Sequence, residues 1–354
     1  MAKLYSNFKF LAFPDHLCAL RQNQPIGPVH VRVKPINRCN HSCWYCAYRA
    51  DNLQLGGDME INDRIPPAKL FEMIDDFIEL GVAAVTFSGG GEPLLYKELP
   101  EAIERLARGG IKTAALTNGG NLKGAMANAF AAHGTWIRVS LDAWDDDSYS
   151  RSRGVGKGAF TALLNNMRAF VARRSSCVLG VSLIVSHDNA PHVENICTLL
   201  KEVGVNHVKI SGAIISNSVA ENNAYHKIIA SNVQASIDRA SNINDSNFSI
   251  INHYHEMEDL FVKEYQSCEI SRFLTVIGAD CEVYTCQDKA YTKSGRLGSI
   301  ANQRFKDFWL SAEAQARLAA INPSQICRHH CVAHHKNLAL QEFLSLDPNH
   351  LSFV

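Results

Sequence analysis

The sequence predicts an α/β fold built on a parallel sheet with both faces covered by helices. From residue 29 onward, short apolar segments alternate with amphipathic segments of helical spacing. The apolar segments are nearly continuous, which is typical of parallel strands buried on both sides. Six such strand–helix units precede the end of the pattern, and six are too few for a closed eight-stranded barrel.

The expected strands are Val29–Asn37, Ala83–Ser88, Lys112–Thr117, Trp136–Asp142, Val178–Ser186 and His207–Ser211. The expected helices between them are Pro67–Leu80, Leu99–Arg108, Lys123–Ala132, Phe160–Arg173 and Val193–Val203. The first helix has the clearest boundaries, because Pro66 and Pro67 stand at its start and Gly81 just past its end.

The pattern changes after Ser216. A polar segment, Ala220–Ile243, is compatible with a helix that has one narrow apolar stripe, and we expect it to close the open edge of the sheet. Further on, Phe273–Ile277 and Glu282–Thr285 flank Gly278 and predict a β-hairpin. The expected division is a lead-in over residues 1–28, a barrel over 29–216, a closing helix and linker over 217–265, and a small α+β domain over 266–354.

Composition and charge narrow the class of protein. The formal net charge of the 354 residues is zero and no run of five or six like charges occurs, which argues against a nucleic-acid partner. No apolar stretch approaches the length of a membrane span, and residues 1–28 lack the apolar core of a signal peptide, so no membrane partner is expected. The eleven cysteines are then expected to serve metal or redox chemistry in the cytoplasm.

Three cysteines lie within eight residues, directly after the first expected strand. Cys39, Cys43 and Cys46 have the spacing C-x3-C-x2-C. An iron–sulfur cube normally takes four cysteines, so a local set of three leaves one iron open to a ligand that is not protein. The alternative is a structural zinc site, but zinc motifs usually have a second pair 12–20 residues on, and the next cysteine is Cys177.

This motif resembles the signature of the radical S-adenosylmethionine (SAM) enzymes. In that family three cysteines hold a [4Fe-4S] cluster whose open iron binds SAM, and reduction cleaves SAM to a 5′-deoxyadenosyl radical. The resemblance covers residues 29–216 well and residues 266–335 more loosely. It implies a partial (β/α)6 TIM-like barrel, which the count of six units matches, with a small C-terminal α+β auxiliary-cluster domain.

The resemblance also implies which residues hold SAM. The segment Phe87–Leu94 resembles the family's Gly-Gly-Glu-Pro motif, which falls here on Gly90, Gly91, Glu92 and Pro93 and would hold the SAM amino group. Further expected SAM contacts are Tyr45 near the adenine, then Asn118, Ser140 and Arg153 on the carboxyl rim of the sheet. The arginine suits a charge-assisted contact with the SAM carboxylate.

The C-terminal cysteines resemble an auxiliary-cluster domain of the SPASM or twitch kind. That resemblance implies one auxiliary [4Fe-4S] cluster with the ligands Cys268, Cys286, Cys327 and Cys331. The spacing of the last pair departs from the usual C-x2-C, so a zinc site formed with the nearby histidines stays open as the alternative. These are His329, His330, His334 and His335. Cys281 lies five residues from Cys286 on the hairpin, and so is not expected to face the same way.

The expected function is that of a radical SAM enzyme acting on a small molecule: a sugar, an aminocyclitol or a sugar nucleotide. Only about 28 residues precede the barrel, which favours this class over a peptide substrate. A flavodoxin- or ferredoxin-type protein would donate electrons. Dehydrogenation with help from the auxiliary cluster, and epimerisation with Cys281 as hydrogen donor, both remain open. Alternatives of other classes are an iron–sulfur electron carrier and a zinc-stabilised binding module.

Overall fold

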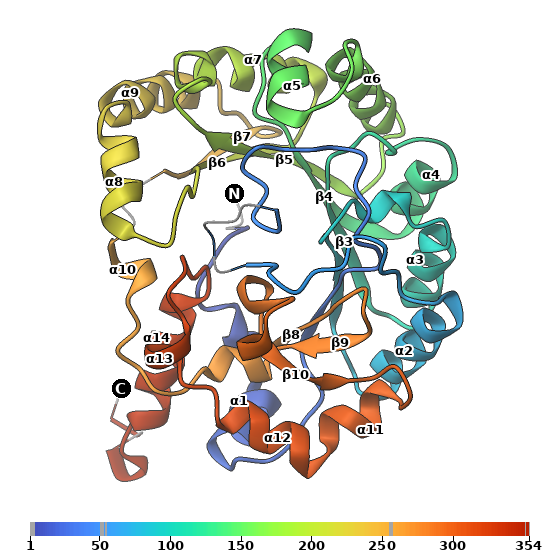
Figure 1. The fold of residues 1–354 in the computed structure, drawn as a ribbon, viewed down its shortest axis with the longest axis vertical. Helices are drawn as coiled ribbons and strands as arrows, with labels where there is room; N and C mark the ends of the chain where they lie inside the picture. The colour runs from blue at the N-terminus through green and yellow to red at the C-terminus, as the bar shows by residue number, and fades with distance from the viewer. Residues whose placement is uncertain (1–3, 50–52, 54, 255–257, 351, 354) are drawn as a thin grey trace.

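A ten-stranded sheet, curved into an open ring, forms the centre of the molecule (Figure 1). The computed structural model describes residues 4–49, 53, 55–254, 258–350 and 352–353. Along the sheet the strand order is β10-β9-β8-β1-β2-β3-β4-β5-β6-β7. Strands β1 to β7 are parallel and lie in chain order, which is the arrangement of a partial barrel, so the predicted fold class is confirmed.

All six predicted strands are present. The parallel strands are β1 His30–Val33, β2 Ala84–Phe87, β3 Lys112–Thr117, β4 Gly134–Ser140, β5 Val178–Val185, β6 His207–Gly212 and β7 Ser249–His253. The helices around them are α2 Pro67–Glu79, α3 Leu99–Arg108, α4 Gly124–His133, α5 Asp146–Arg153, α6 Ala159–Val171 and α7 Val193–Val203. In β1, Val31 and Val33 are fully buried in the main core, and the alternate residues Arg32 and Lys34 occupy the opposite face of the strand.

The expected closing helix is wrong in two respects. Residues 220–243 form two helices, α8 Val219–Lys227 and α9 Ala230–Ser241, and Ile228 between them is exposed. Val233 and Ile237 are buried in the core beside α7, so α9 covers the outside of the sheet. The edge beyond β6 is extended by β7, a short strand that the turn-rich sequence before it concealed.

The predicted hairpin is confirmed, and it continues the same sheet. Strands β8 Leu274–Ile277 and β9 Glu282–Tyr284 are antiparallel, and β10 Arg296–Ser299 follows them. Strand β8 pairs in parallel with β1, with His30 opposite Leu274. The C-terminal region therefore adds three strands to the barrel sheet.

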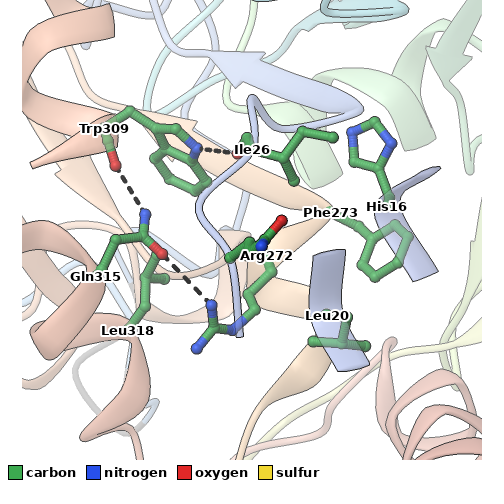
Figure 2. A pocket seen from close by; sticks show the side chains of 9 residues that line it. His16, Leu20, Ile26, Arg272, Phe273, Trp309, Gln315 and Leu318 are labelled. Carbon is green, nitrogen blue, oxygen red and sulfur yellow. Dashed lines mark hydrogen bonds between the residues drawn. The ribbon is translucent and has the colours of Figure 1, made fainter. Parts of the chain in front are cut away.

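Helices from both ends of the chain pack near this extension. They are α1 Pro14–Arg21, α10 Glu258–Phe261, α11 Phe305–Leu310, α12 Ala312–Ala319, α13 Pro323–Ile326 and α14 His334–Ser345. Trp309 donates from Nε1 to the carbonyl of Ile26 at 2.8 Å beside a small space of about 10 Å³ (Figure 2). That space has room for about one water molecule, so it is a packed junction and not a ligand site.

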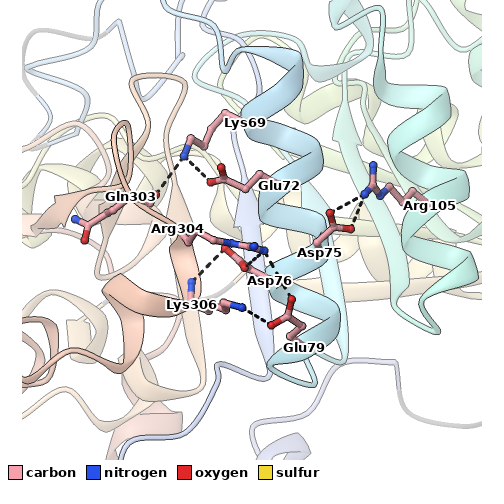
Figure 3. Close-up of polar contacts among 9 residues, drawn as sticks. All are labelled: Lys69, Glu72, Asp75, Asp76, Glu79, Arg105, Gln303, Arg304 and Lys306. Atoms are coloured by element: carbon pink, nitrogen blue, oxygen red, sulfur yellow. Dashed lines mark hydrogen bonds and ion pairs between the residues drawn. The ribbon is translucent and has the colours of Figure 1, made fainter.

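Ion pairs fix the C-terminal region to α2 (Figure 3). Arg304 contacts the fully buried Asp76 at 2.5 Å, and Lys306 contacts Glu79 at 2.5 Å. The half-buried pair of Arg304 and Asp76 fixes the C-terminal region against α2 more firmly than an exposed pair would. Within the described part of the chain, no helix combines the length and apolar character that crossing a bilayer requires.

Candidate active site

The loop after β1 brings three cysteines to the carboxyl rim of the barrel. Cys39, Cys43 and Cys46 are free thiols of intermediate exposure. The loop is fixed by backbone hydrogen bonds: Ser42 N–H donates to the carbonyl of Arg153 at 2.7 Å, and Cys46 N–H donates to that of Cys43 at 3.2 Å. The three thiols are therefore carried by an anchored loop.

The arrangement of these thiols does not match a single tetrahedral metal ion. Thiolates on a tetrahedral zinc ion lie about 3.8 Å apart, as follows from a Zn–S bond of about 2.3 Å. Among the described residues, neither this set nor the C-terminal cysteines include three thiols within 4.8 Å of one another. An iron–sulfur cube spaces its thiolates more widely, so both cysteine sets are compatible with one.

The glycine loop after β2 packs directly against the segment that leads into the cysteines. Gly91 N–H donates to the carbonyl of Ile36 at 3.2 Å, and Glu92 N–H donates to that of Arg38 at 2.9 Å. A Cβ atom on Gly91 would lie 2.0 Å from the carbonyl oxygen of Arg38, and one on Gly90 would lie 2.3 Å from Asn37 Oδ1. Gly91 is needed because two backbones approach each other here, and Gly90 because the Asn37 side chain packs against it.

Glu92 is buried, and its carboxylate binds protein groups. Its Oε1 accepts hydrogen bonds from Leu94 N–H at 2.9 Å and from the Thr117 hydroxyl at 2.5 Å, and its Oε2 accepts from Asn118 N–H at 2.7 Å. Pro93 begins the short 3₁₀ helix that Glu92 caps. Burial raises the pKa of Glu92, and these hydrogen bonds oppose the rise. Glu92 thus joins the ends of β2 and β3.

The other expected SAM contacts lie on the same rim. Asn118 donates from Nδ2 to Asn40 Oδ1 at 2.8 Å, which ties the end of β3 to the cysteine loop. Ser140 ends β4 opposite Ser182 of β5 and is partly exposed. The structure thus gathers Asn118 and Ser140 at neighbouring strand ends, as their positions after predicted strands indicated.

Arg153, the last residue of α5, forms a buried ion pair that the sequence did not predict. Its Nη2 donates to Asp142 Oδ1, and its Nη1 lies 3.5 Å from Cys43 Sγ. Tyr45 also donates to Asp142 Oδ1, at 3.0 Å, and Arg153 lies over its ring. Although burial opposes the charge, the Asp142 carboxylate and the nearby Tyr45 hold the pKa of Arg153 above its usual value.

The four expected auxiliary ligands line one cavity of about 650 Å³ that also reaches the barrel strands. They are Cys268, Cys286, Cys327 and Cys331. Burial, then neighbouring thiols, raise the pKa of Cys268 to about 12; burial, then Asp288, raise that of Cys331 to about 11. Without a metal these thiols stay protonated at neutral pH, and a bound cluster would take them as thiolates.

Two further residues lie beside this cysteine set. Cys286, Asp288 and His329 place one ligand atom each within 4.8 Å of one another. The other nearby histidines face aromatic neighbours: His330 contacts Phe261, and His334 lies 3.2 Å from the Tyr265 hydroxyl. Among the described residues, the segment 327–335 does not assemble a compact zinc site of its own.

Cys281 lies apart from the cavity. It is 6% exposed, belongs to the main hydrophobic core, and is absent from the residues that line the 650 Å³ space. Its backbone has a φ of 59°, because the hairpin turns at this residue. This placement favours an ordinary packing role over hydrogen donation.

Fold and rim together define a partial-barrel protein with one cysteine set in the loop after β1 and a second set lining the cavity. Residues 33–200 match the family model described as the Radical SAM superfamily. This segment is therefore a radical SAM domain, and SAM and a [4Fe-4S] cluster are the cofactors of such a domain.

Curated relatives are similar over the barrel region. A GTP 3′,8-cyclase of Xanthomonas campestris pv. campestris is 33% identical over 159 residues, which are 44% of this chain and 46% of the relative. A SAM-dependent nucleotide dehydratase of Lacinutrix mariniflava is 31% identical over 110 residues, covering 31% of this chain and 22% of the relative. The chain thus spans about half the length, or less, of the curated relatives it matches.

Solved structures share the fold over nearly the whole chain. SuiB of Streptococcus suis bound to the precursor peptide SuiA has a TM-score of 0.61 at 14% identity, covering 89% of this chain and 72% of SuiB. The structure of native anSMEcpe with bound AdoMet has a TM-score of 0.58 at 14% identity, covering 90% of this chain and 96% of that one. At this identity the likeness shows the fold alone.

Proposed function

We propose that this radical SAM enzyme removes hydrogen from a small-molecule substrate, with an auxiliary [4Fe-4S] cluster held in the C-terminal region. The observation that carries the proposal is that one sheet positions two cysteine sets. Cys39, Cys43 and Cys46 lie on the carboxyl rim, and four more cysteines line a cavity that reaches strands β1 to β4. An electron carrier would need neither the glycine loop nor the rim residues around it.

On the rim, the chain's own residues position SAM and shield it. When bound and reduced, the first cluster supplies the electron that cleaves SAM to methionine and the 5′-deoxyadenosyl radical. Gly90 and Gly91 bring backbone groups close to the cysteine loop, and Glu92 fixes that loop to β3. Asp142 stabilises the charge of Arg153 next to Cys43, so Arg153 would be a cationic partner for the SAM carboxylate.

In the C-terminal region, Cys268, Cys286, Cys327 and Cys331 would hold the auxiliary cluster. Lys263 has three backbone acceptors there: its Nζ donates to the carbonyls of Leu260 at 2.7 Å, Phe261 at 2.9 Å and His329 at 2.5 Å. A lysine fixed beside four thiolates offsets part of their negative charge. No three of these thiols lie within 4.8 Å of one another among the described residues, and we therefore favour an iron–sulfur cluster over a zinc ion.

A small molecule is the proposed substrate class. A cavity of about 650 Å³ is in the range that binds cofactor-sized ligands. The names of the two curated relatives, a GTP cyclase and a nucleotide dehydratase, also indicate nucleotide-like substrates. Peptide modification is the second candidate, because the fold of peptide-bound SuiB matches 89% of the chain.

Between the two reaction types, the placement of Cys281 favours oxidation. In a dehydrogenation the substrate would give one hydrogen atom to the 5′-carbon of the deoxyadenosyl group and one proton to a base, and Cys268, Cys286, Cys327 and Cys331 would hold the auxiliary cluster that could accept the remaining electron. An epimerisation would need a hydrogen donor in the cavity, and Cys281 lies outside it. A flavodoxin- or ferredoxin-type donor would reduce the first cluster.

Anaerobic reconstitution followed by dithionite and SAM tests the enzyme assignment. Wild-type protein should form 5′-deoxyadenosine, and the variant with alanine at Cys39, Cys43 and Cys46 should form none. A wild-type protein with full iron content that leaves SAM intact would contradict the proposal and favour an electron carrier.

A further inference from the structure

Positive charge gathers inside the barrel, beneath the SAM rim. Arg32 of β1, Arg138 of β4 and Lys209 of β6 occupy strand positions that alternate with core residues, so they are on the opposite face from the helices. Lys336 of α14 joins them as a lining residue of the 650 Å³ cavity, together with Arg32.

Contacts with Tyr5 show that Arg138 and Lys209 lie close to each other. Arg138 donates from Nη1 to the Tyr5 hydroxyl at 3.1 Å, and Lys209 Nζ lies 5.7 Å from the centre of the Tyr5 ring. Arg138 also lies over the ring of Trp136, which lines the cavity. Arg138 therefore contacts the cavity wall, and both cations contact Tyr5.

The four cations form no salt bridge among the described residues, although the Asp288 carboxylate acts on Arg32 from a longer distance. Of the ion pairs in that part of the chain, none involves Arg32, Arg138, Lys209 or Lys336. The buried Nε atoms of both Arg32 and Arg138 have no hydrogen-bond partner. Buried guanidinium nitrogens are normally hydrogen-bonded, so these two Nε atoms indicate a place for an anionic ligand.

The electrostatics agree with this geometry. Burial, then the nearby Arg138, Lys336 and Arg32, lower the pKa of Lys209 to about 8. Burial and the same Arg138 lower the pKa of Arg32, while Asp288 opposes the shift. Like charges raise one another's free energy in a poorly solvated cavity, and a multiply charged anion would relieve that repulsion.

The auxiliary cluster does not account for all of these cations. Lys263 and Lys289 each interact with more than one thiol of the cysteine set. Arg32 and Lys336 also lie near its thiols, at Cys286 and Cys331. Arg138 and Lys209 lie on the far strands beside Tyr5, and neighbouring thiols do not contribute to the shift in the pKa of Lys209.

We propose that the barrel interior binds a phosphate or diphosphate group of the substrate through Arg32, Arg138, Lys209 and Lys336. This rests on the proposed function, and narrows its substrate to a phosphorylated small molecule. Arg32 lies two residues, roughly 7 Å, before Lys34 along β1, and Lys34 donates to the Gly89 carbonyl of the rim at 2.6 Å. The phosphate would lie deep in the barrel, and the reacting carbon would face SAM.

Calorimetric titration of the reconstituted protein with inorganic pyrophosphate tests the proposal. Wild-type protein should bind pyrophosphate more tightly than citrate, with affinity that falls as salt rises. Arg138→Gln and Lys209→Gln should each weaken pyrophosphate binding at least about tenfold, or about 1.4 kcal/mol. Lys157→Gln, which removes an exposed lysine, is the matched control and should bind as wild type does.

Three results would overturn the proposed phosphate site. They are no pyrophosphate binding by wild type, tighter binding of citrate than of pyrophosphate, and undiminished pyrophosphate binding by both Arg138→Gln and Lys209→Gln. Ligand-free Lys209→Gln should unfold no more easily than wild type, because it relieves repulsion; clear destabilisation would assign Lys209 a structural role instead. If wild type forms 5′-deoxyadenosine but does not bind pyrophosphate, only the phosphate site fails. Binding without SAM cleavage would instead contradict the proposed function.

Discussion

Arg153 and Asp142 form a buried ion pair at the mouth of the barrel, with the guanidinium also 3.5 Å from Cys43 Sγ. The two side chains are only 3% and 4% exposed. The pair joins the end of α5 to the end of β4, next to the loop that carries the cysteines.

Asp142→Asn should therefore be strongly destabilising. The change leaves Arg153 as a buried charge without its counterion, and losing one partner of such a pair costs about 3–5 kcal/mol. Asp147→Asn, which breaks the exposed pair with Lys157, should cost under about 1 kcal/mol. Urea unfolding of both variants measures the difference, and an Asp142 variant as stable as the Asp147 variant would refute the structural role of the pair.

Gly91→Val should disturb the cysteine loop itself. From the sequence we would expect valine here to block SAM and leave the cluster in place, but the added Cβ would lie 2.0 Å from the Arg38 carbonyl. The variant should therefore lose iron as well as SAM binding. Gly156→Ala, with no atom within 4 Å of the new Cβ, is the control. Full iron content in Gly91→Val would show that the loops can separate without loss of the cluster.

Lys34 should make folding stability depend on pH. It is fully buried, and burial, then Arg32, lower its pKa from 10.5 to about 7. Between these values the unfolded chain holds a proton that the folded chain lacks, so stability rises with pH. The free energy of unfolding of wild type, relative to Lys34→Met, should rise from pH 7 to pH 10 by up to about 1.4 kcal/mol per pH unit. If this difference in the free energy of unfolding stayed constant or fell with rising pH, Lys34 would be protonated in the folded protein.

Cys281→Ala should behave as a core substitution. The thiol is buried in the main core and outside the cavity, so its loss should cost about 1 kcal/mol and leave iron content and 5′-deoxyadenosine formation at wild-type levels. Urea unfolding and the SAM cleavage assay measure the two effects. A clear drop in iron or in SAM cleavage would mean that Cys281 serves one of the cofactors.

The sequence was informative where the chemistry is local. The spacing of Cys39, Cys43 and Cys46 and the apolar periodicity of the six strands are both short-range signals, and the strands lie where they were expected. The helix that carries Arg153 was missed, because α5 is polar and its start is marked only by the capping box of Asp145 and Ser148.

Contacts between residues far apart in the chain could not be predicted from the sequence. The pairing of β8 with β1 joins residues some 240 positions apart, and no local pattern predicts it. In strands buried on both faces, periodicity does not tell which side faces the helices, so the inward positions of Arg138 and Lys209 appear only in the structure. The partnership of Asp142 with Arg153 likewise depends on how α5 returns to the rim.

Iron content measures the two-cluster arrangement most directly. After anaerobic reconstitution, wild type should hold about eight irons per chain, four in each cluster. Alanine at Cys39, Cys43 and Cys46 should leave about four irons and abolish 5′-deoxyadenosine formation. Alanine at Cys268, Cys327 and Cys331 should also leave about four irons but retain SAM cleavage. If wild type held only about four irons, or if the first variant still cleaved SAM, the two-cluster account would be contradicted.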